Sequence, residues 1–494
     1  MEDNQDIKKS IKATSLFGGV QVFSILVSIV RTKIVALLIG PVGVGIVELY
    51  NSTIKLITSF TDFSLNVSAV RDVAIAYKSQ DEDRLSHIIS ILSKIVWGTG
   101  LLGTFVCLVA SPLWSKLTFG NYEYTIGFAI LSGTLLLTQL QNGKTVILQA
   151  TERFKYLAYS GIIGNICGLL TAVPIYYIWG IDGVIAVLFL VALFPYIIVS
   201  YFSSKLDIKY ENVKIPTVLK EGKTMLKQGF FLSVNFILST LVFYVLRIFI
   251  TNRGGIAEVG LYSSSFVIVN TYVGMIFTSM GQEYYPRISS LVENKAKFND
   301  AINSQIYLSL LLLGPMIAFF LVFSNQLLTL LYSDKFVGAS MLMALSMLGV
   351  VFQAPGWCLG FAFLAKGDNK AFFCFETIAK VFKLVFDLLF YYLWGLTGLG
   401  LSFLISFIYY MIQSTIVCRH RYGFRLSLNN IALVLAYFVI GVVILYLIIN
   451  ISLLYRIVIG MVFVAVMSYY SFCKLNTIVD ITGFIKNKFS KSND

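Results

Sequence analysis

About fourteen runs of mainly apolar residues, each long enough to cross a bilayer, constrain this chain more than any other feature. They lie near residues 14–38, 45–66, 88–112, 124–142, 157–179, 183–202, 228–251, 258–280, 303–324, 338–365, 372–394, 397–418, 430–451 and 456–472. A helix needs about 20 residues to span, whereas a barrel strand needs about ten of alternating character. Because 57% of the residues are hydrophobic and only 13% are charged, a soluble globular protein is excluded. We predict an all-α polytopic membrane protein with about 14 transmembrane helices.

Lysine and arginine are distributed unevenly between the segments that join these runs. If the N-terminus is cytoplasmic, the cytoplasmic segments hold 27 of the 38 basic residues, and the opposite side holds only Lys116, Arg253, Lys335 and Arg456. Cytoplasmic loops of membrane proteins carry such an excess. We therefore predict that both termini are cytoplasmic. The net charge of +13 then reflects topology and implies no nucleic-acid partner.

The chain also contains an internal repeat. Residues 176–183, YYIWGIDG, return as YYLWGLTG at 391–398, with five of eight positions identical and an offset of 215. LYNS at 49–52 returns as LYSS at 261–264, with an offset of 212. Chance similarity of aromatic-rich helix ends is the alternative explanation. A true repeat predicts two parallel six-helix bundles, at 1–202 and 228–418, joined by a cytoplasmic link at 203–227. A helical hairpin at 430–472 and a cytoplasmic tail at 473–494 follow.

The second run carries a polar stripe. Its members are spaced three or four residues apart, so they share one face of a predicted helix over 45–66. They are Glu48, Ser52, Lys55, Ser59, Asp62 and Asn66. A charge facing lipid costs about 3 kcal/mol or more, so the stripe forms either a seam between helices or the wall of a solute pathway. In a pathway, Ser52, Lys55 and Ser59 would bind substrate, and Glu48 and Asp62 would couple transport to an ion.

Further charges lie inside other runs. The eleventh run has Glu376, Lys380, Lys383 and Asp387 on one face, and these four could largely neutralise one another. Arg31 and Arg247 each lie towards the outer end of the first helix of their half, where snorkelling to the interface is the alternative role.

Cations outnumber anions among these intramembrane candidates, which favours an anionic substrate such as a diphosphate. We assign substrate binding to the cations and possible ion coupling to the carboxylates. The cations are Arg31, Lys55, Arg247, Lys380 and Lys383, and the additional carboxylates are Glu376 and Asp387.

Signals for an enzyme fail on inspection. NGKT at 142–145 resembles a phosphate loop, but Thr138 stands where the first glycine would be required. DED at 81–83 lies in a short loop, and the six cysteines lack metal-binding spacing. We therefore expect no catalysis, no cofactor and no metal, with transport driven by an ion gradient, the substrate gradient or a separate chain.

The run RTKIVALLIGPVGVG at 31–45 resembles the first hairpin of polysaccharide-export flippases, in which a cation-bearing helix leads into an LLGPxGxG turn. The one departure is Ile39 before Gly40. The YYxWGxxG helix turns are also similar. The resemblance covers the first twelve runs and points to the multidrug/oligosaccharidyl-lipid/polysaccharide exporter superfamily. Within it the chain resembles O-antigen flippases (Wzx-type).

That resemblance implies a multi-pass protein of the bacterial inner membrane that moves an undecaprenyl-diphosphate-linked oligosaccharide to the periplasmic leaflet by alternating access. It also implies contacts with other polysaccharide-assembly membrane proteins. By similarity to the related lipid II flippases, Arg31 and Lys55 sit where those proteins place cavity cations.

Three alternatives remain. A multidrug or cation antiporter of the same superfamily would need cavity acids, and the first run offers none. A glycosyl polymerase or ligase would need a sizeable outer loop, and the longest, near 325–337, has about a dozen residues. A structural scaffold would not need charges at membrane depth.

Overall fold

The computed structural model describes residues 2–208, 210–450 and 453–479, and this part of the chain is helical with no strand. The all-α prediction is thus confirmed. Residues 480–494 of the predicted tail lie outside the described residues. Among the described residues, ten helices are long and apolar enough to cross a membrane, as a polytopic protein requires. Three of the ten contain a non-helical or 3₁₀ break at Gly40, Gly180 or Gly395 and hold two predicted runs each. The count of about fourteen stays a prediction.

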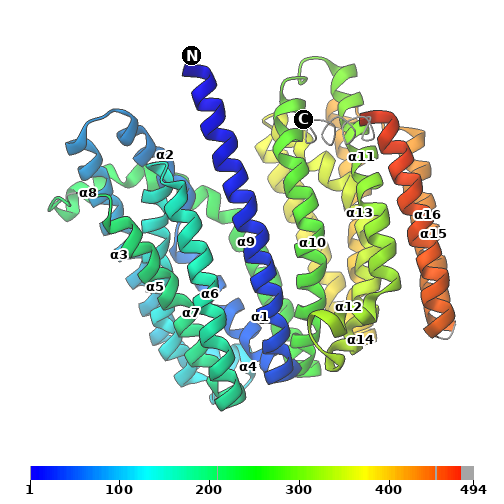
Figure 1. The fold of residues 1–494 in the computed structure, drawn as a ribbon, viewed down its shortest axis with the longest axis horizontal. Coiled ribbons are helices and arrows are strands. Elements are labelled where there is room, and N and C mark those ends of the chain that lie inside the picture. Colours follow the sequence, from blue (N-terminus) through cyan, green and yellow to red (C-terminus); the bar gives the residue numbers. More distant parts are fainter. Residues whose placement is uncertain (1, 209, 451–452, 480–494) are drawn as a thin grey trace, which may run out of the picture. The chain divides into compact units, whose positions relative to one another are not determined.

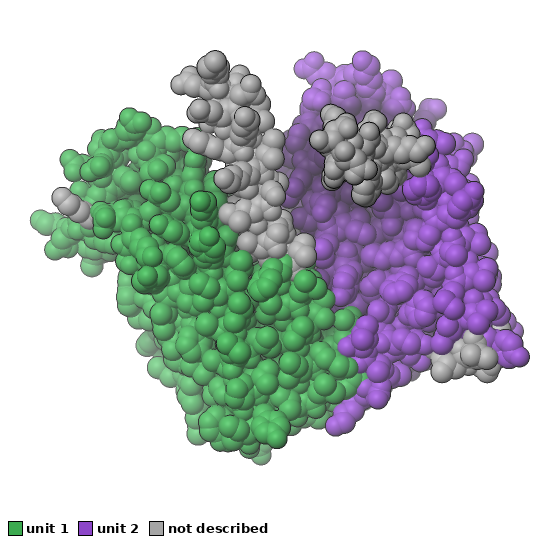
Figure 2. Space-filling model, viewed as in Figure 1, with its two compact units in different colours: residues 1–260, 331–333 green, residues 261–330, 334–494 purple. Residues whose placement is uncertain are grey.

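Two compact units make up the chain, coloured separately in Figure 2. The first comprises residues 1–260 and 331–333, and the second comprises 261–330 and 334–494. The first unit holds α1 (Glu2–Thr61), α2 (Leu65–Lys78), α3 (Glu82–Val109), α4 (Ser111–Phe119), α5 (Thr125–Ala150), α6 (Phe154–Trp179), η1 (Gly180–Gly183), α7 (Val184–Ser204), α8 (Ile215–Glu221) and α9 (Lys223–Gly254).

The second unit holds most of α10 (Ile256–Ser289), followed by α11 (Lys295–Val322), α12 (Ser324–Leu331), η2 (Asp334–Ala339), α13 (Ser340–Ala365), α14 (Asn369–Tyr422), α15 (Leu428–Asn450) and α16 (Leu453–Val479). The predicted hairpin at 430–472 corresponds to α15 and α16, which lie side by side and both pack on α11 (Figure 1). Leu310, Leu313 and Leu321 of α11 are fully buried, which makes that helix central to the unit.

The helix breaks recur at the offset of the sequence repeat. Gly180 has φ 55° and ψ −129°, and Gly395, 215 residues later, has φ 58° and ψ −140°. Gly40 has φ 61° and ψ −169°, and Gly255, also 215 residues later, has φ 84° and ψ 174°. These backbone conformations are essentially restricted to glycine. The recurrence supports a true structural repeat over a chance sequence match.

Helix α9 belongs by its contacts to the first unit, whereas the sequence repeat groups residues 228–251 with the second half. The Ser233 hydroxyl lies 2.8 Å from that of Ser64, and the Tyr244 hydroxyl lies 2.8 Å from that of Thr118. Helix α9 also packs along α1 and α2. The contact boundary therefore falls after Gly260, not at 228.

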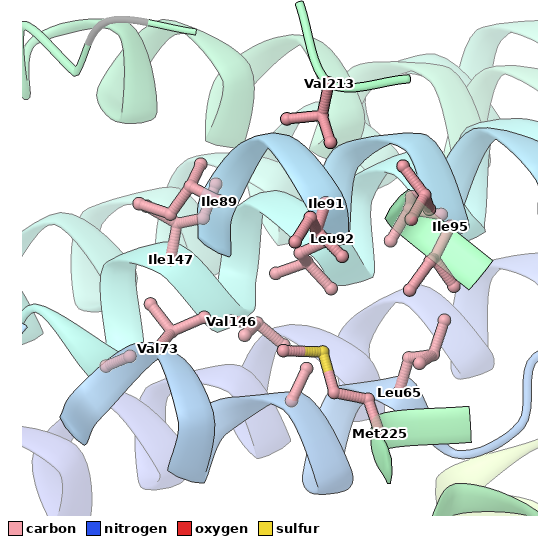
Figure 3. Packing of buried hydrophobic residues seen from close by; sticks show 14 of the residues in the cluster. Leu65, Val73, Ile89, Ile91, Leu92, Ile95, Val146, Ile147, Val213 and Met225 are labelled. Carbon is pink, nitrogen blue, oxygen red and sulfur yellow. The ribbon is translucent and has the colours of Figure 1, made fainter. Parts of the chain in front are cut away.

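The predicted link at 203–227 is folded against the first unit. Val213, Val218 and Met225 are buried in a cluster with Ile89, Leu92 and other apolar residues of α2, α3 and α5 (Figure 3). Burying each such side chain contributes roughly 1.5–3 kcal/mol. The link is thus packed as part of a core and is not a free tether.

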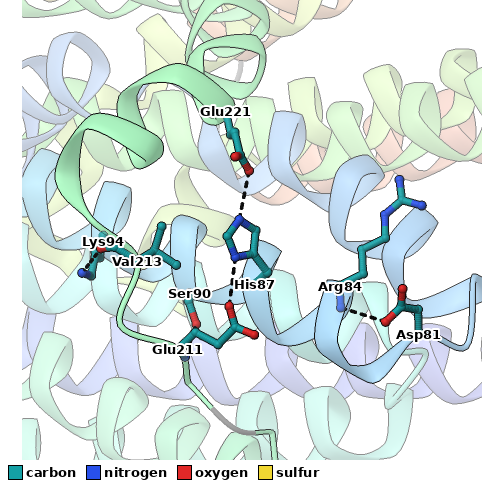
Figure 4. Close-up of polar contacts among 8 residues, drawn as sticks. All are labelled: Asp81, Arg84, His87, Ser90, Lys94, Glu211, Val213 and Glu221. Atoms are coloured by element: carbon teal, nitrogen blue, oxygen red, sulfur yellow. Dashed lines mark hydrogen bonds and ion pairs between the residues drawn. The ribbon is translucent and has the colours of Figure 1, made fainter.

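Polar contacts fix the same link to α3 (Figure 4). His87 Nδ1 lies 2.9 Å from a carboxylate oxygen of Glu211, and its Nε2 lies 3.0 Å from one of Glu221. Lys94 donates to the Val213 carbonyl. These contacts join two parts of the link to α3: the end of the irregular segment that precedes α8, and the end of α8. The start of α9, which follows α8, is therefore held in a defined place.

Candidate functional site

The polar stripe of the second run is shorter than predicted, because α1 ends at Thr61. Phe63 and Ser64 adopt positive φ values of 50° and 45°, and the Ser64 N–H donates to Asp62 Oδ1 at 3.0 Å. An aspartate commonly stabilises a turn in this way. Asn66 consequently lies on α2, so the prediction of one helix over 45–66 was wrong in its last turn.

Two serines of the stripe face the interior of the first unit. Ser52 and Ser59 are only 3% and 1% exposed. Their hydroxyls donate to carbonyls of their own helix, Ser52 to Leu49 at 2.9 Å and Ser59 to Leu56 at 2.7 Å. Of the two interpretations of the stripe, a seam between helices or the wall of a solute pathway, the buried serines favour the seam.

Arg247 and Glu48 form an ion pair between α9 and α1. Arg247 Nη2 lies 3.0 Å from Glu48 Oε2, and the two side chains are largely buried. Beside them, the hydroxyls of Thr53, Thr118 and Tyr244 form a chain with distances of 3.1 and 2.8 Å. The positive charge of Arg247 is therefore neutralised by a carboxylate 199 residues away in sequence.

Arg31 lies against α6. Arg31 Nη1 lies within van der Waals reach of Gly168, 3.5 Å from where a Cβ atom would stand, and Tyr176 of the same helix is close by. Further along the interface, Asn165 donates to the Ser24 hydroxyl at 3.0 Å. Lys55 is exposed. Among the residues that the structure describes, neither Arg31 nor Lys55 forms an ion pair.

The four charges of α14 pair with one another in the second unit. Lys383 Nζ lies 2.5 Å from Asp387 Oδ2, and Lys380 Nζ lies 3.7 Å from Glu376 Oε2. Of the two interpretations of this stripe, mutual neutralisation is the one that the distances support. The five cations predicted from the sequence thus fall into two groups. Arg247, Lys380 and Lys383 form ion pairs, whereas Arg31 and Lys55 form none among the described residues.

Two hydroxyls complete these pairs, and sequence reasoning missed both. Ser402 donates to Asp387 Oδ1 at 2.6 Å, and Tyr410 donates to Glu376 Oε1 at 2.8 Å. Both lie beyond the break at Gly395, where α14 folds back on itself. Counting outward from that glycine would have placed Ser402 opposite Asp387, since they lie seven and eight residues from it.

Lys383 and Asp387 also line a small cavity with Tyr262, Ser346 and Phe403. Its volume of about 10 Å³ suits about one water molecule. Across the described parts of the chain, no three His, Cys, Asp or Glu side chains come together to hold a metal ion.

Comparison with known proteins places this arrangement in a family. A family model described as "Polysaccharide biosynthesis protein" matches residues 10–292. No curated protein matches the chain significantly. The structure of the lipid II flippase MurJ in an inward closed conformation is similar, with a TM-score of 0.69 and 16% identity over 93% of this chain and 99% of MurJ.

Two transporters of the MOP superfamily share the fold as well. An inward-facing multidrug resistance transporter of the MATE family gives a TM-score of 0.67 and 15% identity, over 82% of this chain and 94% of its own. A transporter from Pyrococcus furiosus gives 0.52 and 13%, over 84% and 95%. At such identities the likeness concerns the fold alone. Because the family model covers more than half of the 494 residues, the chain belongs to the polysaccharide biosynthesis protein family and has the multi-pass fold of MOP-superfamily transporters.

Proposed function

We propose that this protein is a flippase that moves an undecaprenyl-diphosphate-linked oligosaccharide, an O-antigen or similar surface-glycan repeat unit, across the bacterial inner membrane by alternating access. One observation carries the proposal. Arg31 and Lys55 form no ion pair among the described residues, whereas Arg247, Lys380 and Lys383 each lie beside a carboxylate. The first unit therefore keeps two uncompensated positive charges on predicted membrane helices.

Uncompensated cations at membrane depth are expensive, and a bound anion would compensate them. A diphosphate supplies about two negative charges, and each charge-assisted hydrogen bond contributes roughly 1.5–3 kcal/mol. We assign substrate binding chiefly to Arg31 and Lys55. Arg247 contributes only when its pair with Glu48 opens, and Ser52 and Ser59 shape the helix that carries Lys55.

The extent of the structural match favours a lipid-handling protein. MurJ, a lipid II flippase by name, matches 93% of this chain, whereas the MATE transporter matches 82%. The difference is about 54 residues, close to the 50 residues of α15 and α16. We infer that this hairpin belongs to the function shared with the flippase.

A multidrug or cation antiporter is the second candidate, because the MATE transporter shares the fold with a TM-score of 0.67, against 0.69 for MurJ. Such a protein would use a carboxylate to bind a cation. Asp62 lies in the turn directly after α1 and forms no ion pair with Arg or Lys among the described residues, which makes it the residue such a mechanism would require. The two candidates thus predict opposite sensitivities at Asp62 and Lys55.

The test is a charge series at Lys55 in a bacterial strain that lacks its own flippase, with surface polysaccharide as the readout. Lys55→Ala should reduce export sharply, since losing one charge-assisted contact costs about 1.4 kcal/mol or more, a factor of ten. Lys55→Arg should retain much of the activity, and Lys55→Glu should be worse than alanine because it repels the diphosphate.

The matched control is Lys155→Glu, the same charge reversal at an exposed lysine of α6 in the same unit. Protein levels are measured in the same membranes. If Lys55→Glu inserts normally and exports as well as the parent, an anionic substrate is excluded. A loss of export in Asp62→Asn alone would then favour the antiporter.

A further inference from the structure

A large cavity lies at one end of four helices of the second unit, and none of the candidate site residues lines it. Its volume is about 820 Å³, and it opens between the end of α10, the start of α11, the start of α15 and the end of α16. The adjoining loops, near 290–294 and 423–427, are on the side that the distribution of lysine and arginine predicts to be cytoplasmic. The cavity therefore lies at the level of lipid headgroups.

Two cations line the cavity. Lys474, near the end of α16, is exposed and forms no ion pair with the rest of the described chain. Arg287, on α10, donates to Gln305 Oε1 at 2.6 Å, and its Nε lies 2.9 Å from Glu283 Oε1. Glu283 is 65% exposed, so it compensates Arg287 only weakly through a solvated contact. The net charge at the cavity is positive.

One wall is held in place by hydrogen bonds. Asn303 Oδ1 of α11 accepts from the Ser427 N–H at 2.8 Å and from Asn430 Nδ2 at 3.1 Å. Asn430 also donates to the Asn303 carbonyl at 2.9 Å, and it is only 1% exposed. These bonds fix the start of α15 on α11, so the cavity is a preformed feature and not a gap between loosely packed helices.

The lining changes from polar to apolar. Ser304 and Asn429 add polar groups beside the cations, while Leu308, Leu433 and Ala436 lie one to two helical turns further into the apolar parts of α11 and α15. A free inorganic anion would use only the first group. A lipid would use both, with its phosphate at the cations and the upper part of a chain along the leucines.

We propose that this cavity binds a phosphate-bearing headgroup, and that its source is an anionic phospholipid of the cytoplasmic leaflet. Basic pockets between transmembrane helices on that side are suited to such headgroups, and each lysine or arginine near the surface contributes roughly 1 kcal/mol. The site would anchor the α15–α16 hairpin to the lipid that surrounds it. None of the proposed substrate cations lines the cavity, so this proposal does not depend on the proposed function.

The experiment is native mass spectrometry of the purified full chain with phosphatidylglycerol, phosphatidylcholine or inorganic phosphate added. Phosphatidylglycerol should be retained, and Lys474→Glu should lower its occupancy by about fivefold or more, as expected for losing one surface cation. Arg287→Gln should act in the same direction. Lys370→Glu, the same reversal at an exposed lysine at the start of α14, is the matched control and should leave occupancy unchanged.

The outcomes separate the sources of phosphate. Retention of phosphatidylglycerol that millimolar inorganic phosphate does not displace supports the lipid. Displacement by phosphate alone supports a phosphate site and overturns the lipid as its source. Equal binding of phosphatidylcholine, or equal loss in Lys370→Glu and Lys474→Glu, overturns the site. Lys474 is exposed, and a thermal unfolding curve of each variant verifies that the fold is kept.

Discussion

Asp387 carries the one fully buried charged side chain among the described residues, at 1% exposure. Its two oxygens are occupied by Lys383 at 2.5 Å and by Ser402 at 2.6 Å. Removing one partner of such a buried ion pair strongly destabilises the folded protein, because the other charge stays buried without compensation. The arrangement suits a carboxylate that takes up a proton as Lys383 moves away, and this is the ion-coupling role we propose for it.

We predict that Asp387→Asn lowers the unfolding temperature in detergent, with a cost of about 3 kcal/mol. The double variant Lys383→Met/Asp387→Asn removes both charges and should recover most of that loss. In proteoliposomes, both variants should fail to respond to an imposed pH gradient if Asp387 couples transport to protons.

The double variant separates stability from coupling, because its fold should be close to normal. A double variant that is stable and still responds fully to the gradient would remove Asp387 from the coupling role. Glu376 would then be the next carboxylate to substitute, because it also lies on α14 and accepts a hydrogen bond from Tyr410 at 2.8 Å. Asp62 and Glu48 of the first unit would follow.

At the scale of elements, the reversal within α14 depends on Gly395. Its φ of 58° and ψ of −140° match those of Gly180 between α6 and α7, and a side chain at either glycine would meet no other atom within 4 Å. A steric clash of a larger side chain is therefore not the reason for glycine at these breaks. The requirement is the backbone conformation itself, which costs other residues about 1–3 kcal/mol.

We expect Gly395→Ala to lower the unfolding temperature by an amount that corresponds to about 1–3 kcal/mol. Gly274→Ala is the matched control, because Gly274 lies inside α10 and a Cβ there also meets nothing within 4 Å. In a helix interior, alanine is favoured over glycine by up to about 1 kcal/mol. Equal unfolding temperatures for the two variants, measured by a thiol-reactive dye in detergent, would show that the break tolerates an ordinary residue.

At the scale of the whole molecule, the proposal requires both termini and the link before α9 to lie in the cytoplasm. Val213 and Val218 of the link are buried in a cluster with residues of α3 and α5. We therefore expect the link to stay with the first unit during transport. A substrate that enters from the cytoplasmic leaflet must then reach the cations from the side on which this link lies.

Single cysteines test this topology in a background without the natural cysteines. At Ser79, Lys223 and Lys295, which are all exposed, they should react with a membrane-impermeant reagent only after permeabilisation. A cysteine at Asn121, exposed in the loop after α4, should react in intact spheroplasts. Labelling of position 223 from outside would contradict the predicted orientation.

Local properties of the sequence were enough to predict the membrane class, the positions of most helices and the repeat. Apolar length is a property of a continuous segment, and the glycines of YYIWGIDG and YYLWGLTG impose the same backbone break wherever they occur. The presence of charges at membrane depth was equally readable, because a charged residue inside an apolar run is visible without knowing its neighbours.

Only the tertiary structure decided which of those charges are compensated. The i, i+4 pairs of α14 were open to sequence reasoning, but Glu48 meets Arg247 across 199 residues, and Asp387 meets Ser402 across a chain reversal. The turn after Thr61 likewise moves Asn66 off the stripe, through two positive φ values that periodicity does not reveal. Helical spacing defines the face on which a side chain lies, whereas its partner depends on which helix packs against that face.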